Sequence, residues 1–244
     1  MMNIVAIIPA RFGSTRFPGK PLALVGGVAM IERVVRRVEG SNVVDRVVVA
    51  TDDKRIEEAV KKFGGEVVMT PVDCPNGTFR CQAVIAHLDP KPDAILNVQG
   101  DEPFVHPEQL KELVHLIRKP GASIATLAIP MQPSDPGRED VNRVKVVRNL
   151  NGRALYFSRS PIPHSEGPWL QHVGLYAFTT SALEALVELH PTKLEERESL
   201  EQLRWLAHGW RIDVGTTNHR TPSVDTPDDL KKIESLLGNG WSVD

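Results

Sequence analysis

The feature that most constrains the fold is an alternation of short apolar runs with amphipathic segments in the early part of the chain. The apolar runs cover residues 3–9, 45–51, 65–70 and 93–98, and the amphipathic segments cover 30–40, 53–65 and 78–88. Short runs rich in Val and Ile are typical of strands buried on both faces, and helices between them predict βαβ units. We therefore expect an α/β fold with a mostly parallel sheet, and functional residues at the carboxyl ends of its strands.

The pattern changes after about residue 129, where a stretch rich in Pro and polar residues is followed by closely spaced strand-like runs. This change predicts a smaller α+β lobe over residues 130–190. The main domain would then be formed by residues 1–129 and 191–244, with the run RIDVG at 211–215 returning to the main sheet.

Composition limits the classes of partner. The chain has 244 residues with 29 basic and 31 acidic side chains, a formal charge of −2, so general attraction to nucleic acid or anionic lipid is not expected. No apolar run approaches the roughly 20 residues of a membrane span. The two cysteines, Cys74 and Cys81, fit neither a zinc pair nor a disulfide scaffold. We expect free thiols in a reducing cytoplasm.

The first expected strand runs into a loop that is unusually rich in cations. The stretch PARFGSTRFPGKPL at 9–22 holds Arg11, Arg16 and Lys20 together with two glycines. It is not a P-loop, because Pro21 follows the lysine where Ser or Thr is required, and it also lacks the GxGxxG pattern. Backbone N–H groups and three cations after a first strand favour binding of a polyanion such as a triphosphate. Solvated loop charges are the alternative.

Two aspartates are candidates for a metal site. Asp101 follows the apolar run at 93–98, where a carboxylate can hold Mg²⁺ against phosphate oxygens, although a turn residue is the alternative. Asp225 precedes an expected last helix with Pro227 at its first position. Thr226 suits the N-cap of that helix, which leaves Asp225 free to point elsewhere. The apolar face of the helix would be formed by Ile233, Leu236 and Leu237.

Other candidate site residues also have structural explanations. In NGTFR at 76–80, Thr78 would cap a helix, and Arg80 in its first turn is electrostatically unfavourable unless an anion lies nearby. His172 and Tyr176 are four residues apart and fall on one face of a strand, where His172 could be a buried core histidine. Glu201 and Gln202 could be only the polar face of a helix.

Together these stretches resemble the 3-deoxy-manno-octulosonate (Kdo) cytidylyltransferases, also called CMP-Kdo synthetases. The resemblance covers nearly the whole chain and rests on motifs in the family's order, namely IIPARFGSTRFPGKPL, VVVATDD, NVQGDEP, ALYFSRSPIP, HVGLY, LEQLRWLAHG and VDTPDDL. It implies a Rossmann-like nucleotidyltransferase fold, a smaller lobe and a homodimer. It also implies transfer of CMP from CTP to Kdo with Mg²⁺, releasing pyrophosphate, for lipopolysaccharide assembly.

The resemblance also implies roles for individual residues. It places the nucleotide on Pro9, Ala10, Arg11, Gly13, Arg16, Lys20, Asn76, Gly77, Thr78 and Arg80. It places the sugar acid among Gln99, Arg159, His172, Tyr176, Glu201 and Gln202. Asp101 and Asp225 would bind Mg²⁺, and Arg11, Lys20 and Asp101 would act in catalysis.

Three residues depart from the family's pattern: Phe79, where an acid is usual, Gln171, where Arg is frequent, and Ser223, where Gly is usual. An acid at position 79 would give Arg80 a charge partner, so we expect Phe79→Glu to tighten CTP binding unless Phe79 fills an apolar gap. Two alternative functions stay open: synthesis of CMP-sialate, and nucleotide binding without catalysis.

Overall fold

The computed structural model describes residues 2–14, 16–165 and 167–238. Residues 239–244 of the expected main domain lie outside this range, as does Thr15 of the cation-rich loop. The chain divides into two compact units. The first holds the residues up to Lys111 and those from Arg220 onward, and the second runs from Glu112 to His219.

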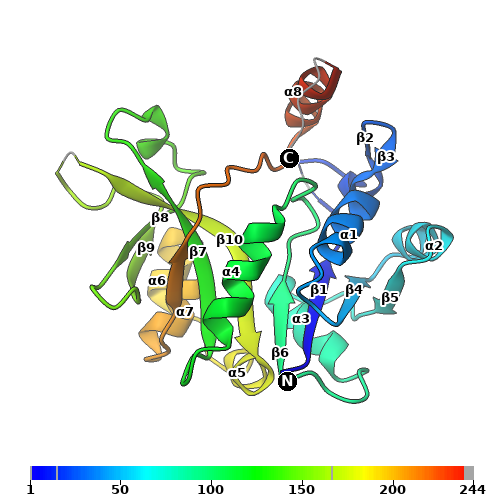
Figure 1. Cartoon of the computed structure of the whole chain (residues 1–244), viewed down its shortest axis with the longest axis horizontal. Coiled ribbons are helices and arrows are strands. Elements are labelled where there is room, and N and C mark those ends of the chain that lie inside the picture. Colours follow the sequence, from blue (N-terminus) through cyan, green and yellow to red (C-terminus); the bar gives the residue numbers. More distant parts are fainter. Residues whose placement is uncertain (1, 15, 166, 239–244) are drawn as a thin grey trace. The chain divides into compact units, whose positions relative to one another are not determined.

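The sheet of the first unit consists of parallel strands in the order β6, β1, β4, β5 (Figure 1). Their bounds are β1 (Ile4–Pro9), β4 (Arg46–Thr51), β5 (Glu66–Met69) and β6 (Ala94–Asn97). In β1, Ile4, Ala6, Ile7 and Ile8 are fully buried, so consecutive side chains on both faces are removed from water. The expected α/β class and the four expected strands are confirmed.

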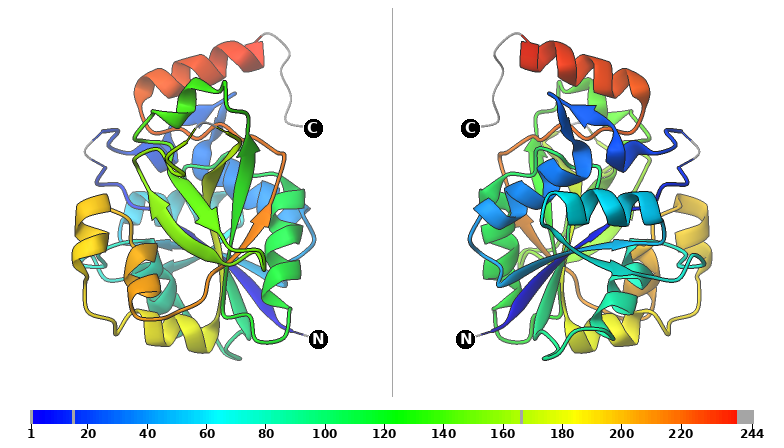
Figure 2. Two further views of the ribbon diagram at one scale, coloured as in Figure 1. Left: turned by 90° about the vertical axis from the view of Figure 1, so that its left-hand side faces the viewer. Right: turned by 90° about the vertical axis from the view of Figure 1, so that its right-hand side faces the viewer.

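Helices connect these strands. They are α1 (Met30–Gly40), α2 (Lys54–Lys62) and α3 (Gly77–Ile85). Because such crossovers are right-handed and the chain reverses direction across the sheet after β5, α1 and α2 cover one face and α3 the other. Figure 2 (right) shows α1 and α2 on the same face.

Before α1 the chain forms a short 3-10 turn, Lys20–Leu22, and a hairpin of β2 (Leu24–Val25) and β3 (Val28–Ala29). Helix α4 (Pro107–Ile117) was not predicted from the sequence.

The second unit contains β7 (Ile124–Met131), β8 (Lys145–Arg148), β9 (Ala154–Ser158), β10 (Trp169–Thr179) and β11 (Asp213–Thr216). β10 pairs antiparallel with β7 and with β8, β8 pairs antiparallel with β9, and β11 pairs parallel with β7. Its helices are α5 (Thr180–Leu186), α6 (Lys193–Glu198) and α7 (Gln202–Ala207), with a 3-10 turn at Pro136–Arg138. None of the helices in the described ranges is long and apolar enough to cross a membrane.

The second unit extends beyond the lobe expected over residues 130–190. It begins earlier because β7 starts at Ile124 and pairs with β10. It ends later because β11 pairs with β7, and residue Ala154 is hydrogen-bonded to Ile212. Segment 191–219, expected in the main domain, therefore lies in the second unit. The roles assigned to the two expected domains stay predictions.

The last helix, α8 (Pro227–Gly238), begins as expected. Thr226 is its N-cap: the Thr226 hydroxyl accepts a hydrogen bond from Asp229 N at 3.2 Å, and an Asp229 carboxylate oxygen accepts one from Thr226 N at 3.0 Å. This reciprocal pair is a capping box with Asp in place of Glu. Ile233 is buried and Leu237 packs partly, but Leu236 is 43% exposed, so its expected place on the apolar face was wrong.

Helix α3 is capped two residues earlier than expected. The N-cap is Asn76, whose backbone is extended and whose Oδ1 accepts a hydrogen bond from Phe79 N at 3.1 Å. The expectation that Thr78 caps this helix was wrong, because Thr78 is already its second residue and is buried. Asn76 thus shapes the start of α3 as well as the loop before it.

Replacing Asn76 by Ala is expected to lower the free energy of unfolding by about 1 kcal/mol, because the helix loses a side-chain acceptor for an N-terminal N–H group. Asn76→Asp keeps the acceptor and is the matched control. Urea unfolding of both variants would measure the difference. Equal stability of Asn76→Ala and the wild type would contradict the capping role.

Candidate functional site

A cavity of about 260 Å³ lies in the first unit beyond the carboxyl ends of β1 and β6. Most residues expected to bind the nucleotide line it: Pro9, Ala10, Arg11, Arg16, Lys20, Asn76, Gly77 and Arg80. Gln99, Asp101 and Asp225 line it as well. Gly13 lies in the loop and Thr78 is buried in α3, and neither is among the lining residues that the structure describes. The expected gathering of cations and carboxylates at the strand ends therefore occurs.

Some lining residues had no assigned role in the sequence. They are Ser14, Pro21, Cys74, Pro75 and Gly100. The sequence could have indicated Gly100, since a glycine directly before an acid at a strand end permits close backbone approach. A Cβ atom at position 100 would lie 2.8 Å from the carbonyl oxygen of Pro9, so only glycine fits there without a backbone shift. Cys74 and Pro75 carried no comparable signal.

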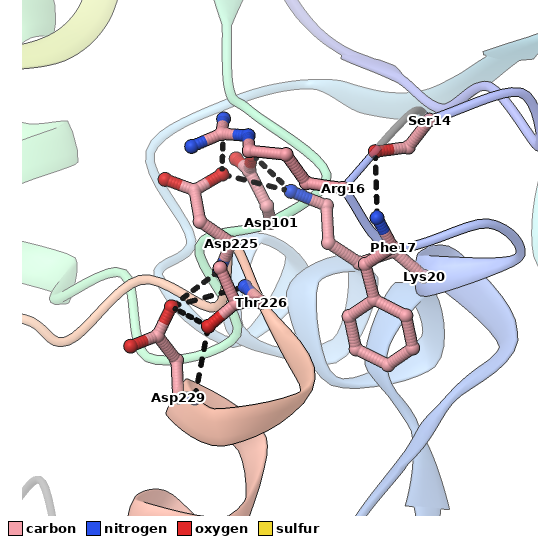
Figure 3. Close-up of polar contacts among 8 residues, drawn as sticks. All are labelled: Ser14, Arg16, Phe17, Lys20, Asp101, Asp225, Thr226 and Asp229. Atoms are coloured by element: carbon pink, nitrogen blue, oxygen red, sulfur yellow. Dashed lines mark hydrogen bonds and ion pairs between the residues drawn. The ribbon is translucent and has the colours of Figure 1, made fainter.

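Lys20 lies between the two candidate metal aspartates (Figure 3). Its ammonium group donates to Asp101 Oδ2 at 2.7 Å and to Asp225 Oδ1 at 3.2 Å. Arg16 also donates to Asp225 Oδ1, at 3.1 Å. The Lys20 side chain is only 13% exposed, whereas Arg16 is 63% exposed. Two cations and two carboxylates thus form a charge-balanced cluster, and the expectation that Asp225 points away from its helix is confirmed.

The cation-rich loop is closed on itself by backbone hydrogen bonds. The carbonyl oxygen of Phe12 accepts from Ser14 N and Gly19 N, both at 2.9 Å. Gly19 has a left-handed backbone with φ 72°, and a Cβ atom there would lie 3.0 Å from the Phe12 ring. The Arg55 guanidinium also stacks on the Phe12 ring, 3.3 Å from the ring centroid. These contacts fix the position from which Arg16 and Lys20 extend.

Asp225 is held close to Asp101 by the segment that precedes it. Val224 N donates to the carbonyl oxygen of Asp101 at 3.1 Å, and the Val224 side chain is fully buried beside Phe104 and Ile233. The capping box of Thr226 fixes the other side of Asp225 (Figure 3). The relative position of the two carboxylates therefore follows from burial of one valine and from the start of one helix.

Glu102 is a third acid beside this cluster. Burial, together with the negative charges of Asp101 and Asp225, raises the pKa of Glu102 to about 8, against the opposing effects of Thr221 and Lys20. Thr221 donates its hydroxyl to Glu102 Oε2 at 3.4 Å. Glu102 is therefore mostly protonated at neutral pH and adds little charge to the aspartate pair.

The residues at this site fit a magnesium ion. Mg²⁺ in enzymes with phosphate substrates is usually held by one or two carboxylates, with water and phosphate oxygens as the other ligands. Asp101 and Asp225 supply two carboxylates that already share one cation, and both border the cavity. No group of three or more His, Cys, Asp or Glu side chains suited to a metal occurs in the described part of the chain.

Arg80 has a charge partner within the protein. It is only 4% exposed and forms an ion pair with Asp52 at 2.9 Å, and it also donates to the Thr70 hydroxyl. The expectation that Arg80 lacks a partner because position 79 is Phe was wrong. Asp52 follows β4, so its proximity to the start of α3 depends on the sheet order. The change Phe79→Glu would therefore not supply a missing charge partner for Arg80.

Arg159 lies in the second unit, and its guanidinium is held by backbone carbonyls. It donates to Glu198 O at 2.8 Å, to Val141 O at 3.0 Å and to Ser199 O at 3.3 Å. Its own carbonyl oxygen accepts from the fully buried Lys145 at 2.8 Å. No carboxylate lies within ion-pair distance of this guanidinium in the residues described. Arg159 thus has a fixed orientation and no ion-pair partner among the described residues.

The other residues expected at the sugar acid also lie in the second unit, except Gln99. The rings of His172 and Tyr176 lie 5.4 Å apart, which confirms that they share a strand face. The Tyr176 hydroxyl is buried without a hydrogen-bond partner in the described structure. Burial, and then the charge of Glu201, raises the pKa of Tyr176. Gln202 is buried, so it is not part of a solvated polar face.

His172 is neutral. Desolvation lowers its pKa to about 3. The Thr126 hydroxyl lies 2.9 Å from His172 Nε2 and 2.8 Å from the carbonyl oxygen of Leu175. Because the hydroxyl has one proton and the carbonyl can only accept, Thr126 donates to Leu175 and His172 Nε2–H donates to Thr126. His172 Nδ1 is then left as an acceptor.

Comparisons with known proteins agree with this arrangement. A family model described as cytidylyltransferase matches residues 5–212. A protein of Bacteroides thetaiotaomicron called 3-deoxy-manno-octulosonate cytidylyltransferase is 46% identical, over 98% of this chain and 99% of its own. One of the same name from Anaeromyxobacter dehalogenans is also 46% identical, over 98% and 100%.

Comparison with solved structures points to the same family. The structure described as CMP:2-keto-3-deoxy-manno-octonic acid synthetase complexed with CTP has a TM-score of 0.92 and 39% identity, over 98% of this chain and all of that one. A 4-diphosphocytidyl-2C-methyl-D-erythritol synthase of Anaerococcus prevotii, with a TM-score of 0.65 and 17% identity, shares the fold. Fold and site therefore define a nucleotidyltransferase. The chain belongs to the cytidylyltransferase family and, within it, to the 3-deoxy-manno-octulosonate cytidylyltransferases.

Glu102→Gln is expected to stabilise the protein relative to the wild type increasingly as the pH rises. The carboxyl group has a pKa of 4.5 as its ordinary value and about 8 in the fold, so the folded state binds more protons between these values. The stability that the protonated group contributes is present in full below pH 4.5 and is lost as the pH rises through 8. Gln imitates the protonated form at every pH.

Thermal melting from pH 5 to 9 would measure this difference, with the exposed Glu188→Gln as control. A difference between Glu102→Gln and the wild type that does not change with pH would contradict the raised pKa.

The ring signals of His172 are expected not to shift in an NMR titration between pH 5 and 8, because a group with a pKa of about 3 stays neutral over this range. Comparison with His172→Asn would identify the signals. A midpoint near 6.5, the ordinary value, would show that His172 is exposed to water and charged in acid.

Proposed function

We propose that this protein transfers CMP from CTP to 3-deoxy-D-manno-octulosonate, giving CMP-Kdo and pyrophosphate for lipopolysaccharide assembly. The observation that carries the proposal is the cavity beyond β1 and β6, where three cations and two aspartates meet. The names of the relatives, and the CTP complex of the similar synthetase, support the identity of both substrates.

The phosphates of CTP would lie on the cation-rich loop. Arg11, Arg16 and Lys20 all border the cavity. Arg11 is exposed and makes no hydrogen bond or ion pair with the described residues, so its charge is available to a phosphate at once. Three cations and the N–H groups of a closed loop can neutralise the triphosphate and the charge that develops on leaving pyrophosphate.

The nucleoside would be enclosed by Pro9, Ala10, Asn76 and Gly77. Arg80 contributes to this wall as a fixed group, because its guanidinium is already engaged with Asp52 and Thr70. When bound by Asp101 and Asp225, Mg²⁺ would add positive charge at the phosphate oxygens. Mg²⁺ binding is part of the proposal.

In the first unit, Gln99 borders the cavity and would bind Kdo. In the second unit, the residues proposed to bind Kdo are Arg159, His172, Tyr176, Glu201 and Gln202. The carbonyl-held guanidinium of Arg159 offers a full positive charge to the sugar carboxylate. Neutral His172 offers an acceptor, and the unpartnered Tyr176 hydroxyl a donor, to sugar hydroxyl groups. The anomeric hydroxyl would attack the α-phosphorus in line with departure of pyrophosphate.

Two further parts of the proposal concern the setting of the enzyme. We propose a homodimer, as the family resemblance implies, and a cytoplasmic location, which agrees with Cys74 and Cys81 not being joined in a disulfide. CMP-sialate synthesis is less favoured, since the relatives quoted above carry the Kdo name.

Pyrophosphate release should be observed with CTP, Mg²⁺ and Kdo together, and not when any one is omitted. N-acetylneuraminate in place of Kdo is expected to give turnover at least 10²-fold lower, because groups that hydrogen-bond one sugar acid are left unpaired by another. Release with N-acetylneuraminate at the rate found with Kdo would favour CMP-sialate synthesis. Binding of CTP without any release would favour a non-catalytic protein.

Asp101→Asn is expected to lower kcat by about 10²-fold or more while changing the melting temperature little, because a partly exposed carboxylate that faces the substrate is lost. Asp228→Asn, in an exposed ion pair on α8, is the control. A variant with near-normal kcat at saturating CTP and Mg²⁺ would rule out the proposed role of Asp101.

A further inference from the structure

We infer that Lys20 occupies the place of the divalent cation in the nucleotide-free protein, so that the aspartate pair takes a metal only together with a nucleoside triphosphate. The inference rests on the proposed function and concerns the species that the site accepts. It makes the metal–nucleotide complex, and not the free cation, the ligand of this cavity.

The first observation is that Lys20 spans both carboxylates. Its ammonium group lies 2.7 Å from an Asp101 oxygen and 3.2 Å from an Asp225 oxygen (Figure 3). Arg16 adds a second positive charge at 3.1 Å from the same Asp225 oxygen. The two negative charges are therefore already balanced. A divalent cation that entered between the carboxylates would have to displace the ammonium group or lie beside it against strong repulsion.

The second observation is that Lys20 can leave without a change of fold. Its backbone is fixed, because its N–H donates to Phe17 O at 3.2 Å and its carbonyl oxygen accepts from Ala23 N at 3.0 Å. Pro21 next to it is buried. The ammonium group extends from this fixed point on a flexible chain of four methylene groups, so rotation of the side chain alone can move it within the cavity.

The third observation is that the cavity holds more positive charge than the carboxylates can satisfy. Arg11 borders the same space as Lys20 and Arg16 without a partner in the described residues. A triphosphate brings several negative charges, which gives Lys20 and Arg16 new partners and leaves Asp101 and Asp225 free. The two cations and the two carboxylates then exchange partners. Nucleotide and metal must each strengthen the binding of the other by the same factor.

The test measures binding of Mn²⁺, as the probe metal, to the full chain in the absence of Kdo, so that no turnover occurs. Wild-type protein is expected to bind Mn²⁺ weakly alone and more tightly with CTP. Lys20→Met removes the charge at nearly constant length. It should bind Mn²⁺ about 5- to 150-fold more tightly than wild type without CTP, within the usual range of such couplings, and gain less from CTP.

Three variants control the measurement. Lys231→Met removes a lysine paired with Asp228 outside the site and should behave as wild type. Lys20→Arg keeps the charge and should keep the strong dependence on CTP. In Lys20→Met with Asp101→Asn, the tighter binding of Mn²⁺ should disappear. Melting curves of each variant establish that it is folded.

The outcomes separate the inference from the proposed function. Equal Mn²⁺ affinity of wild type and Lys20→Met without CTP would overturn the inference, and so would wild-type affinity that CTP leaves unchanged. Because CTP itself binds Mn²⁺, the comparison with a Lys20 variant is the deciding one, and Lys20→Ala provides it if Lys20→Met does not fold. Failure of wild type to bind CTP at all, with Mn²⁺ present, would instead contradict the proposed function.

Discussion

The structure of the site depends on one interaction, the sharing of a lysine by two aspartates that are far apart in the sequence. Lys20 comes from the loop after β1, Asp101 from the end of β6 and Asp225 from the start of α8. Three chain segments can meet in this way only because β1 and β6 are parallel neighbours that end at the same edge. The lysine balances the charge of the two carboxylates, and they in turn hold its ammonium group in the cavity.

Much of the supporting structure serves to bring these groups within reach of each other. The loop that carries Lys20 is closed by the Phe12 carbonyl and needs a left-handed Gly19, where any Cβ atom would meet the Phe12 ring. The approach of β1 to the residues after β6 needs Gly100 for a similar steric reason. Asp225 is placed by burial of Val224 and by the Thr226 cap. Apolar packing and backbone geometry thus impose a charge arrangement that would not form spontaneously on a solvated surface.

Features that depend on local sequence were predictable, and features that depend on sheet order were not. The strands and the cap at Thr226 follow from patterns a few residues long, and the strand-end rule placed Asp101 and Lys20 together. Asn76 and Thr78 are both good caps, so sequence alone could not choose between them. The partner of Arg80 is Asp52, which only the adjacency of β4 and the first strand brings near α3. Leu236 fitted the helical period but had no surface to cover it.

Under the proposed function, the cations that would bind the anionic substrates are held in two different ways in this molecule. Arg159 is oriented by carbonyl oxygens, which direct the guanidinium without cancelling its charge, so it is ready for a carboxylate at all times. Lys20 and Arg16 are oriented by carboxylates, which cancel their charge until another cation replaces them. The first arrangement suits a substrate that arrives alone. The second suits one that arrives with a metal, because the exchange of partners then leaves every charge in the cavity paired.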